Sequence, residues 1–349
     1  MSETDTVTDR PASAPKARAR ARLLQGGILL LLFALLPAVL VWFDRGYFYQ
    51  LAMLALIFVL LAGSLHLVTG VAGLLHLGHA AFYGVGAYIA GLLAADHGIG
   101  FTIGLPLAGL GAAAIAFLVA LPTMRLVSIY FAVATLAIGQ MLFLVMQNWV
   151  AVTKGPNGVI LFGGIDLFGL EIGSRLGIYY VVAVVVAVSI WVIHRLTDSY
   201  YGNALRSLRE DDQCAGAMGL DTVRLKMEAF TIASFFAGIA GALWAYTTGY
   251  ISPVDFDFFE SILILAMVVV GGLGSLPGAI LGALLLILLP EVLRDVGDVR
   301  NMLVGLVMFL SILFLPKGLF GEVPALALMR RHFDAAWPGA GERRVGWRG

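Results

Sequence analysis

The sequence predicts an all-α polytopic membrane protein, because it is strongly apolar and contains repeated hydrophobic runs. Of its 349 residues, 60% are hydrophobic and 13% are charged, and the mean hydropathy is +0.94. A soluble domain carries about 25% charged residues. Several apolar runs reach about 20 residues, the helix length that crosses roughly 30 Å of hydrocarbon. A membrane β-barrel would show short segments of alternating hydrophobicity instead.

About ten membrane segments follow from these runs, and eight to ten are compatible with the sequence. In chain order they are residues 23–43, 48–68, 74–95, 101–121, 126–149, 177–194, 228–250, 258–273, 276–294 and 300–316. The third and eighth are the weakest, since glycine and histidine interrupt the third and the eighth is short. We expect broken or re-entrant helices near residues 70–86 and 271–278, where glycines cluster, because irregular backbone is tolerated where it lines a cavity.

The two ends of the chain are more polar than its centre. Residues 1–22 end in KARARAR, and we interpret them as a disordered basic tail in the cytoplasm. The alternative is a cleaved signal peptide, but the apolar run 23–43 is long for one and no small-x-small cleavage site follows it. We assign residues 23–320 to a transmembrane domain and residues 321–349 to a C-terminal cytoplasmic tail.

The distribution of Lys and Arg predicts the orientation. With the N-terminus inside, 17 of the 22 basic residues lie on the inner side and five lie outside, which is the bias expected of cytoplasmic loops. Both basic termini favour the same side, hence an even number of segments. The Gly-rich loop 150–176 then lies outside, where it either caps a pathway or only connects two helices. The loop 195–226 lies in the cytoplasm.

The cytoplasmic loop 195–226 holds five basic and five acidic residues. Asn203 is a favourable N-cap for a helix over residues 204–218, and Gly219 suits the left-handed conformation that ends helices. Arg206 and Glu210 stand four residues apart, so an ion pair is available. A loop that only fixes topology would need the basic residues, but neither the acidic ones nor a capped helix. We therefore interpret this loop as a surface presented to another molecule.

The same loop resembles a known family. Residues 206–226 (RSLREDDQCAGAMGLDTVRLK) look like the cytoplasmic coupling loop of ABC-transporter permeases, specifically the branched-chain amino-acid permease family. The matching positions are Arg206, Arg209, Glu210, Ala215, Met218, Gly219 and Lys226. Residues 73–88 and 252–278 resemble the same family, so the likeness extends from about Phe48 to Phe320. His76 departs from it, because the family usually has Ser there.

The resemblance implies the membrane-spanning permease subunit of an importer in the bacterial cytoplasmic (inner) membrane. Its cargo would be branched-chain or other hydrophobic amino acids. Its partners would be two ABC ATPase subunits, a second homologous permease, a periplasmic substrate-binding protein and membrane lipid. The coupling contacts to the ATPase would come from Arg206, Arg209, Glu210, Ala215 and Gly219.

The sequence also argues that the energy source is a separate subunit. A P-loop needs a Lys followed by Ser or Thr, whereas the four lysines here are followed by Ala, Gly or Met. We expect no enzymatic activity, no catalytic residues and no cofactor in this chain, because ATP would be bound by the partner subunits. The zero net charge does not suggest a nucleic-acid partner.

The glycine clusters are the candidate translocation path, represented by His76, Gly78, His79, Gly271 and Gly272. Broken helices expose amides and carbonyls that suit a zwitterionic amino acid. The alternative is close helix packing through small residues, which we favour for any single glycine but not for the clusters. A helix would place His76 and His79 on one face. We favour a buried, hydrogen-bonded role at a helix end over a proton relay, and expect no metal site.

Two other functions remain compatible with the sequence. The same machinery could import urea or short amides, because related permeases look alike. A stand-alone secondary transporter or channel is the alternative from a different class, and it predicts ion-driven flux by this chain without ATPase subunits.

Overall fold

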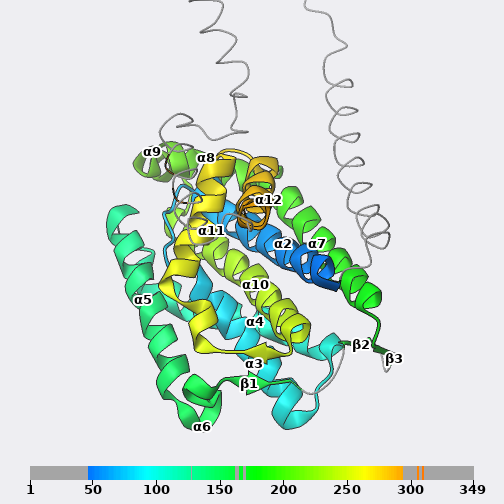
Figure 1. Ribbon diagram of the computed structural model, residues 1–349. Coiled ribbons are helices and arrows are strands. Elements are labelled where there is room, and N and C mark those ends of the chain that lie inside the picture. Colours follow the sequence, from blue (N-terminus) through cyan, green and yellow to red (C-terminus); the bar gives the residue numbers. More distant parts are fainter. Residues whose placement is uncertain are drawn as a thin grey trace, which may run out of the picture. The chain divides into compact units, whose positions relative to one another are not determined.

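The computed structural model describes residues 46–126, 128–161, 165–167 and 170–293, together with Gly305 and Phe309. It is mostly helical (Figure 1). The chain divides after Leu51 into two units, and the contacts discussed below belong to the second. The predicted tails and segment 23–43 lie outside the described residues, as does segment 300–316 apart from Gly305 and Phe309.

Five helices among the described residues are long and apolar enough to cross a membrane. They cover Tyr47–Val71, Phe101–Thr123, Ile129–Asn148, Arg175–Thr197 and Thr222–Thr248. Each coincides with a predicted segment. Three further predicted segments correspond to the helices α3 (His79–His97), α11 (Phe258–Gly271) and α12 (Leu276–Val292). The prediction of a helical membrane protein is therefore confirmed, while the count of about ten segments stays a prediction.

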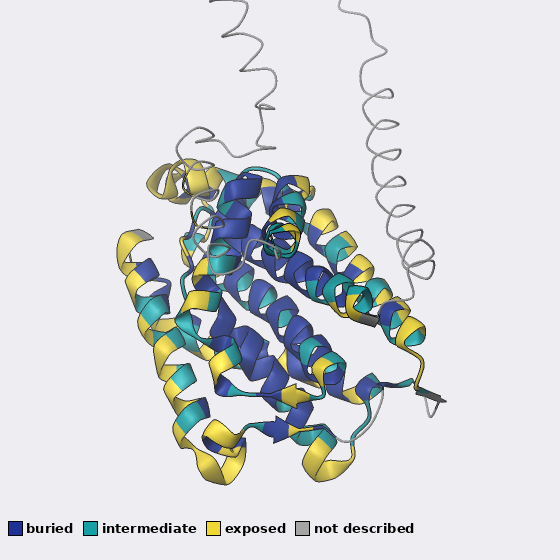
Figure 2. Cartoon of the chain, viewed as in Figure 1, coloured by how far each residue is buried: buried dark blue, intermediate teal, exposed yellow. Residues whose placement is uncertain are grey.

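The core of the second unit is built around α10 (Thr222–Thr248), which packs most extensively against α4 (Phe101–Thr123) and α3. Small residues allow the close approach, because a Cβ atom on Gly86 of α3 would overlap the backbone of Gly238 in α10. Such small-residue contacts are the usual basis of helix packing in membranes. Helices α3 and α10 are accordingly mostly buried, whereas α4 and α5 (Ser128–Asn148) expose much of their surface (Figure 2).

At the first glycine cluster, the helical structure is interrupted over a shorter range than predicted. Helix α2 (Gly46–Leu65) continues into the π-helix η1 (His66–Val71), residues 72–78 are non-helical, and α3 then begins at His79. A break near 70–86 is thus confirmed for residues 72–78, but α3 continues unbroken through Gly84 and Gly86. Those two glycines pack against neighbouring segments, which is the alternative interpretation of single glycines.

The second glycine cluster connects two helices. Helix α11 ends at Gly271, Gly272 has φ +117°, and Ser275 caps α12 by accepting a hydrogen bond from Gly278 N at 3.2 Å. A Cβ on Gly271 would overlap the carbonyl oxygen of Gly278. The small residues therefore let α11 and α12 pack tightly on either side of the turn.

The predicted outer loop 150–176 forms several short elements. They are α6 (Val150–Thr153), η2 (Gly155–Asn157), β1 (Val159–Ile160), β2 (Ile165–Leu167) and β3 (Leu170–Ile172). Strand β2 pairs with β3, and β1 pairs with β4 (Tyr250–Ile251), which precedes η3 (Pro253–Phe256). Helix α7 (Arg175–Thr197) begins after Ser174. Figure 1 shows α6 and β1 at the end of the bundle opposite α8 (Tyr200–Glu210) and α9 (Asp212–Ala217).

Candidate coupling and translocation sites

The charged loop forms two short helices, α8 and α9. Ser199 caps α8, and the Oδ1 atom of Asp211 caps α9 by accepting from Gln213 N and Cys214 N, both at 2.9 Å. The predicted single helix over 204–218 with Asn203 as its cap was therefore wrong. Asp211 is extended, at φ −156° and ψ 111°, because an Asp side chain that caps a following helix interrupts the preceding one. Gly219, at φ +90°, has the predicted left-handed conformation.

The charged side chains of this loop face two ways. Arg206 Nη1 donates to Asn203 Oδ1 at 3.0 Å, and the ion pair with Glu210 that the spacing makes available does not form among the described residues. Glu210 is exposed. Arg209 points the other way, because its Nη1 donates to the carbonyl oxygen of Gly70 in η1 at 2.7 Å. Helix α8 is held against the membrane domain by this bond and by its buried Leu205 and Leu208.

An ion pair holds the N-terminal end of helix α9, and the residues at its C-terminal end are exposed. Lys226 of α10 pairs with Asp212 of α9, and only 10% of the Lys226 side chain is exposed. Ala215 is buried, so it faces inward rather than toward a partner. Met218 is 85% exposed, and no heavy atom lies within 4 Å of a Cβ built on Gly219. Of the predicted coupling residues, Arg209, Glu210 and Gly219 are therefore exposed and Arg206 is half-buried, and the exposed Met218 lies beside Gly219.

The charge state of this loop is set locally. Hydrogen bonds from Cys214 hold the pKa of Asp211 below its ordinary value, so Asp211 is ionised at neutral pH. The same carboxylate accepts from the Cys214 thiol and raises its pKa. Cys214 is exposed and stays protonated at neutral pH, since its pKa lies above that of an ordinary thiol.

His76 and His79 lie together at the start of α3. Their ring centroids are 5.3 Å apart and the rings are nearly perpendicular. Ser64 Oγ lies 2.9 Å from His79 Nε2, and Gly78 N donates to His76 Nδ1 at 3.4 Å. Both side chains are buried. The prediction that they share one helix face was wrong, because His76 precedes the helix, but both are buried and hydrogen-bonded at a helix end.

The non-helical segment 72–78 and the first turn of α3 are hydrogen-bonded to two other helices. Leu77 N donates to Thr135 Oγ1 of α5 at 3.1 Å, and Ala80 N donates to Ser261 Oγ of α11 at 3.0 Å. Gly78 packs so closely on α5 that a Cβ would overlap the carbonyl oxygen of Thr135. Gly78 therefore has a packing role in addition to its place in the break.

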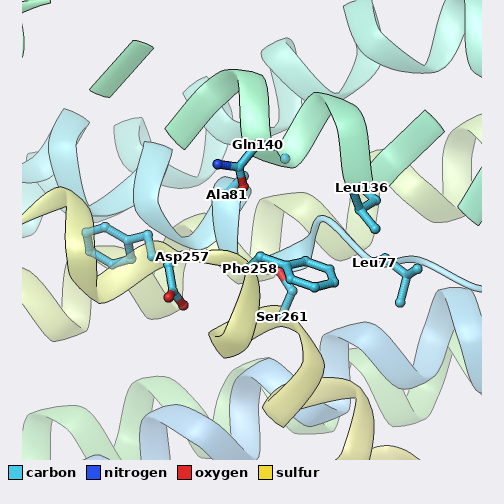
Figure 3. Close-up of a pocket in the computed structure, with 9 residues that line it drawn as sticks. Leu77, Ala81, Leu136, Gln140, Asp257, Phe258 and Ser261 are labelled. Atoms are coloured by element: carbon cyan, nitrogen blue, oxygen red, sulfur yellow. The ribbon is translucent and has the colours of Figure 1, made fainter. Parts of the chain in front are cut away.

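A small pocket lies beside this segment, with room for about one water molecule; the 180 Å³ of space around it includes open solvent. Figure 3 shows Gln140 of α5 on one side and Asp257 and Ser261, at the start of α11, on the other. The remaining lining is mainly apolar, with Leu77, Ala81, Leu136, Gly139, Phe256 and Phe258. A pocket with a carboxylate, an amide and apolar side chains has the chemistry for an ammonium group and a hydrophobic side chain.

The predicted path residues did not include Gln140, Asp257 or Ser261. The sequence offered little signal for Asp257, because it caps α11 at the edge of an apolar run, where its Oδ1 accepts from Glu260 N at 3.0 Å. Gly271 and Gly272 do not line this pocket. The second cluster instead meets the first at Gly70, where a Cβ would overlap the carbonyl oxygen of Leu273. No group of three or more His, Cys, Asp or Glu able to hold a metal ion occurs among the described residues.

Comparison with known proteins gives one consistent family. A family model described as "Branched-chain amino acid transport system / permease component" matches residues 47–315. The chain is 38% identical over 316 residues to the high-affinity branched-chain amino acid transport system permease protein LivM of Escherichia coli (strain K12), which covers 83% of this chain and 74% of that protein.

More distant relatives carry related names. The permease protein LivH of the high-affinity branched-chain amino acid transport system of Salmonella typhimurium is 28% identical over 198 residues, covering 53% of this chain and 62% of that protein. A probable branched-chain amino acid transport permease protein LivM of Methanocaldococcus jannaschii is 26% identical over 228 residues, covering 59% and 64%. No solved structure matches.

Proposed function

Because the chain belongs to the branched-chain amino acid transport permease family, we propose that it is the membrane-spanning subunit of an ABC importer for branched-chain or other hydrophobic amino acids. The chain is an integral membrane protein and a permease subunit of an amino acid transport system.

The capped helix pair α8–α9 is the observation that carries the proposed ATPase coupling. Two short helices are anchored to the membrane domain by Arg209 and Lys226 and present an open edge with Met218 and Gly219. A surface loop without a partner needs neither two caps nor two anchors. The edge suits a separate ATPase subunit, because the sequence of this chain contains no P-loop lysine.

The remaining partners follow from the family. The chain is similar both to LivM and to LivH permease proteins, which supports pairing with a second, homologous permease. A periplasmic substrate-binding protein would deliver the cargo. The bacterial inner membrane and cytoplasmic termini are proposed from the positive-inside bias. ATP would be bound only by the two ATPase subunits.

The pocket beside residues 72–78 is the proposed part of the translocation path. The Asp257 carboxylate would attract the ammonium group of an amino acid, the Gln140 amide would bond its carboxylate, and Leu136 and Phe258 would contact its side chain. Urea or a short amide would leave the apolar walls without a partner and the carboxylate without a cation. The pocket chemistry therefore favours a hydrophobic amino acid over those alternatives.

Uptake by the intact complex in proteoliposomes tests this function. The permease is purified with its second permease and ATPase subunits, and its substrate-binding protein is added with radiolabelled leucine. Uptake is expected to require ATP and the binding protein, and to be inhibited by excess isoleucine or valine but not by acetamide.

Two outcomes would contradict the proposal. Uptake of urea or acetamide without uptake of leucine would identify the other cargo class. Flux of leucine through this chain alone, driven by a proton or sodium gradient, would identify a secondary transporter.

A further inference from the structure

We propose that Arg209 is a positioning residue that couples movement of α8 to both glycine-rich breaks at once. The inference rests on the proposed function, because it names the route by which an ATPase docked at α8–α9 would act on the membrane domain. Arg209 would act through the backbone of the breaks and need not touch either ATP or cargo.

The first observation is the bond from Arg209 to the end of η1. Its Nη1 atom donates to the Gly70 carbonyl oxygen at 2.7 Å, a distance typical of a charge-assisted hydrogen bond. Carbonyl groups in the last turn of a helix lack partners within the helix, and a cation is favoured at that end. Arg209 therefore provides a hydrogen-bond donor to a carbonyl oxygen at the C-terminal end of η1, where the helical span that begins with α2 ends.

The second observation is that the backbone of α8 itself lies on the break. A Cβ built on Gly73 would be 2.7 Å from Arg209 Cγ and 3.3 Å from Arg209 Cα. Gly73 also has φ +74°, a conformation that glycine adopts at little cost. The contact thus involves the helix and not only the end of a flexible side chain, so a displacement of α8 must displace residues 70–73.

The third observation brings in the other break. A Cβ on Gly70 would overlap the carbonyl oxygen of Leu273 and the ring of His66. The turn between α11 and α12 therefore lies against the same residue that Arg209 holds. His66 is buried, and its Nδ1 atom has no hydrogen-bond partner among the described residues. Helix α8, η1 and the 272–275 turn consequently meet at Gly70, and a packed junction transmits displacement rather than absorbing it.

Neighbouring arginines do not make such a connection. Arg206 bonds to Asn203 on its own helix, and Arg224 Nε bonds to Glu228 Oε1 at 2.8 Å on its own helix. All three are cationic side chains of the same cytoplasmic region, yet the hydrogen bond of Arg209 reaches an element more than a hundred residues away. The difference identifies Arg209 as the coupling contact and provides Arg224 as a matched control.

The first test compares Arg209→Met with Arg224→Met in the intact complex. Met keeps most of the side-chain stem but cannot donate to Gly70. Leucine uptake per ATP hydrolysed is expected to fall at least tenfold for Arg209→Met, with the ATPase subunits still co-purifying, and to stay within twofold of wild type for Arg224→Met. Arg209→Lys, which retains a charged donor, should recover part of the loss.

The second test reports the junction directly. Leu75 in the break is 39% exposed, so Leu75→Cys in a Cys214→Ser background gives one reactive thiol there. Its rate of maleimide labelling is expected to change at least threefold when the complex is trapped with ATP and vanadate. Addition of Arg209→Met should abolish that change, which a merely structural loss of stability would not do selectively.

The outcomes separate this inference from the proposed function. ATP-dependent leucine uptake by wild type, combined with normal coupling and normal nucleotide-dependent labelling in Arg209→Met, would overturn the inference alone. Absence of ATP-dependent uptake by wild type would overturn the proposed function. Should Arg209→Met fail to assemble, the same two measurements are made on Arg209→Gln, whose shorter neutral side chain cannot make the charge-assisted bond to Gly70; normal coupling and labelling in that variant would also overturn the inference.

Discussion

Glycine has two distinct roles in this chain, and the surroundings of each residue tell them apart. Gly86 and Gly271 lie where another backbone occupies the place of a Cβ, whereas Gly73 and Gly219 have positive φ angles. Sequence clustering alone could not separate these cases, because it reports neither distance nor φ. The sequence therefore predicted the breaks correctly in part, but extended the first one over Gly84 and Gly86, which are packing residues of α3.

A pair of glycine substitutions measures the packing role. Gly86→Ala would place a methyl group on the backbone of Gly238, so we expect a loss of about 1–3 kcal/mol in stability from overpacking. Gly216→Ala in helix α9 is the control, because its new methyl group would lie 3.8 Å from Thr222 Cγ2, an ordinary van der Waals contact. Ala should stabilise that helix slightly, by up to about 1 kcal/mol. Thermal unfolding in nanodiscs, monitored by tryptophan fluorescence, measures both variants. Equal unfolding midpoints for Gly86→Ala and Gly216→Ala would contradict the packing assignment of Gly86.

The site residues were predictable to the extent that they carry unusual chemistry for a membrane. His76 and His79 were found because imidazoles are rare in apolar segments, and their place at a helix end followed from the glycines beside them. Asp257 was missed since it stands at the edge of an apolar run, where a carboxylate is common. The coupling role of Arg209 stays a prediction, and the side of α8 on which it lies depends on where that helix begins, which the sequence misplaced.

At the scale of elements, the cap of α9 decides the shape of the proposed coupling surface. Two amide hydrogen bonds to Asp211 separate α9 from α8. The expected single helix failed here, because helix propensity favoured continuation through residues 204–218 and took no account of an aspartate that bonds to its own downstream amides. The length of the whole charged loop and its left-handed end at Gly219 were nevertheless predictable from composition and glycine chemistry.

Removal of this cap is expected to loosen α9 alone. Asp211→Ala should increase hydrogen exchange at Gln213 and Cys214 at least tenfold, while Asp211→Asn, which keeps an acceptor oxygen, should preserve most of the protection. The pKa of Asp211 is depressed in the folded state, so its contribution is complete above the ordinary aspartate range, about pH 4. It is lost only as the pH falls through the lower folded value. Protection that disappears already near neutral pH would contradict this assignment.

At the scale of the whole molecule, the orientation of the bundle can be tested with the chain's single cysteine. Cys214 is exposed on α9, on the side that we propose is cytoplasmic. A membrane-impermeant maleimide is expected to label it in inside-out vesicles and not in intact spheroplasts.

The control lies at the opposite end of the bundle. Trp149, which is 56% exposed, precedes α6, so Trp149→Cys in a Cys214→Ser background should show the reverse pattern. Labelling of Cys214 from outside would reject the positive-inside assignment and, with it, ATPase docking at α8–α9.

The helical class and the positions of the long spans could be read from hydropathy, because length and apolarity are local properties of the chain. The three-helix core could not be read in that way. Helix α10 carries a charged beginning and a mean hydropathy below that of the other candidate spans, at 1.5, yet it lies at the centre. Its place depends on Gly238 meeting Gly86 of α3, a match between residues far apart in sequence.

The central place of α10 also has a consequence in time. Helices α3 and α4 leave the ribosome first, and α10 follows α3 by roughly 120 residues. At about 5–20 residues per second, that interval is on the order of ten seconds. During it, the surfaces of α3 and α4 that later pack against α10 lack that partner. Completion of the core must therefore wait for synthesis of the second half of the chain, and a nascent protein stalled before Thr222 is an unfinished bundle that quality-control proteases can recognise.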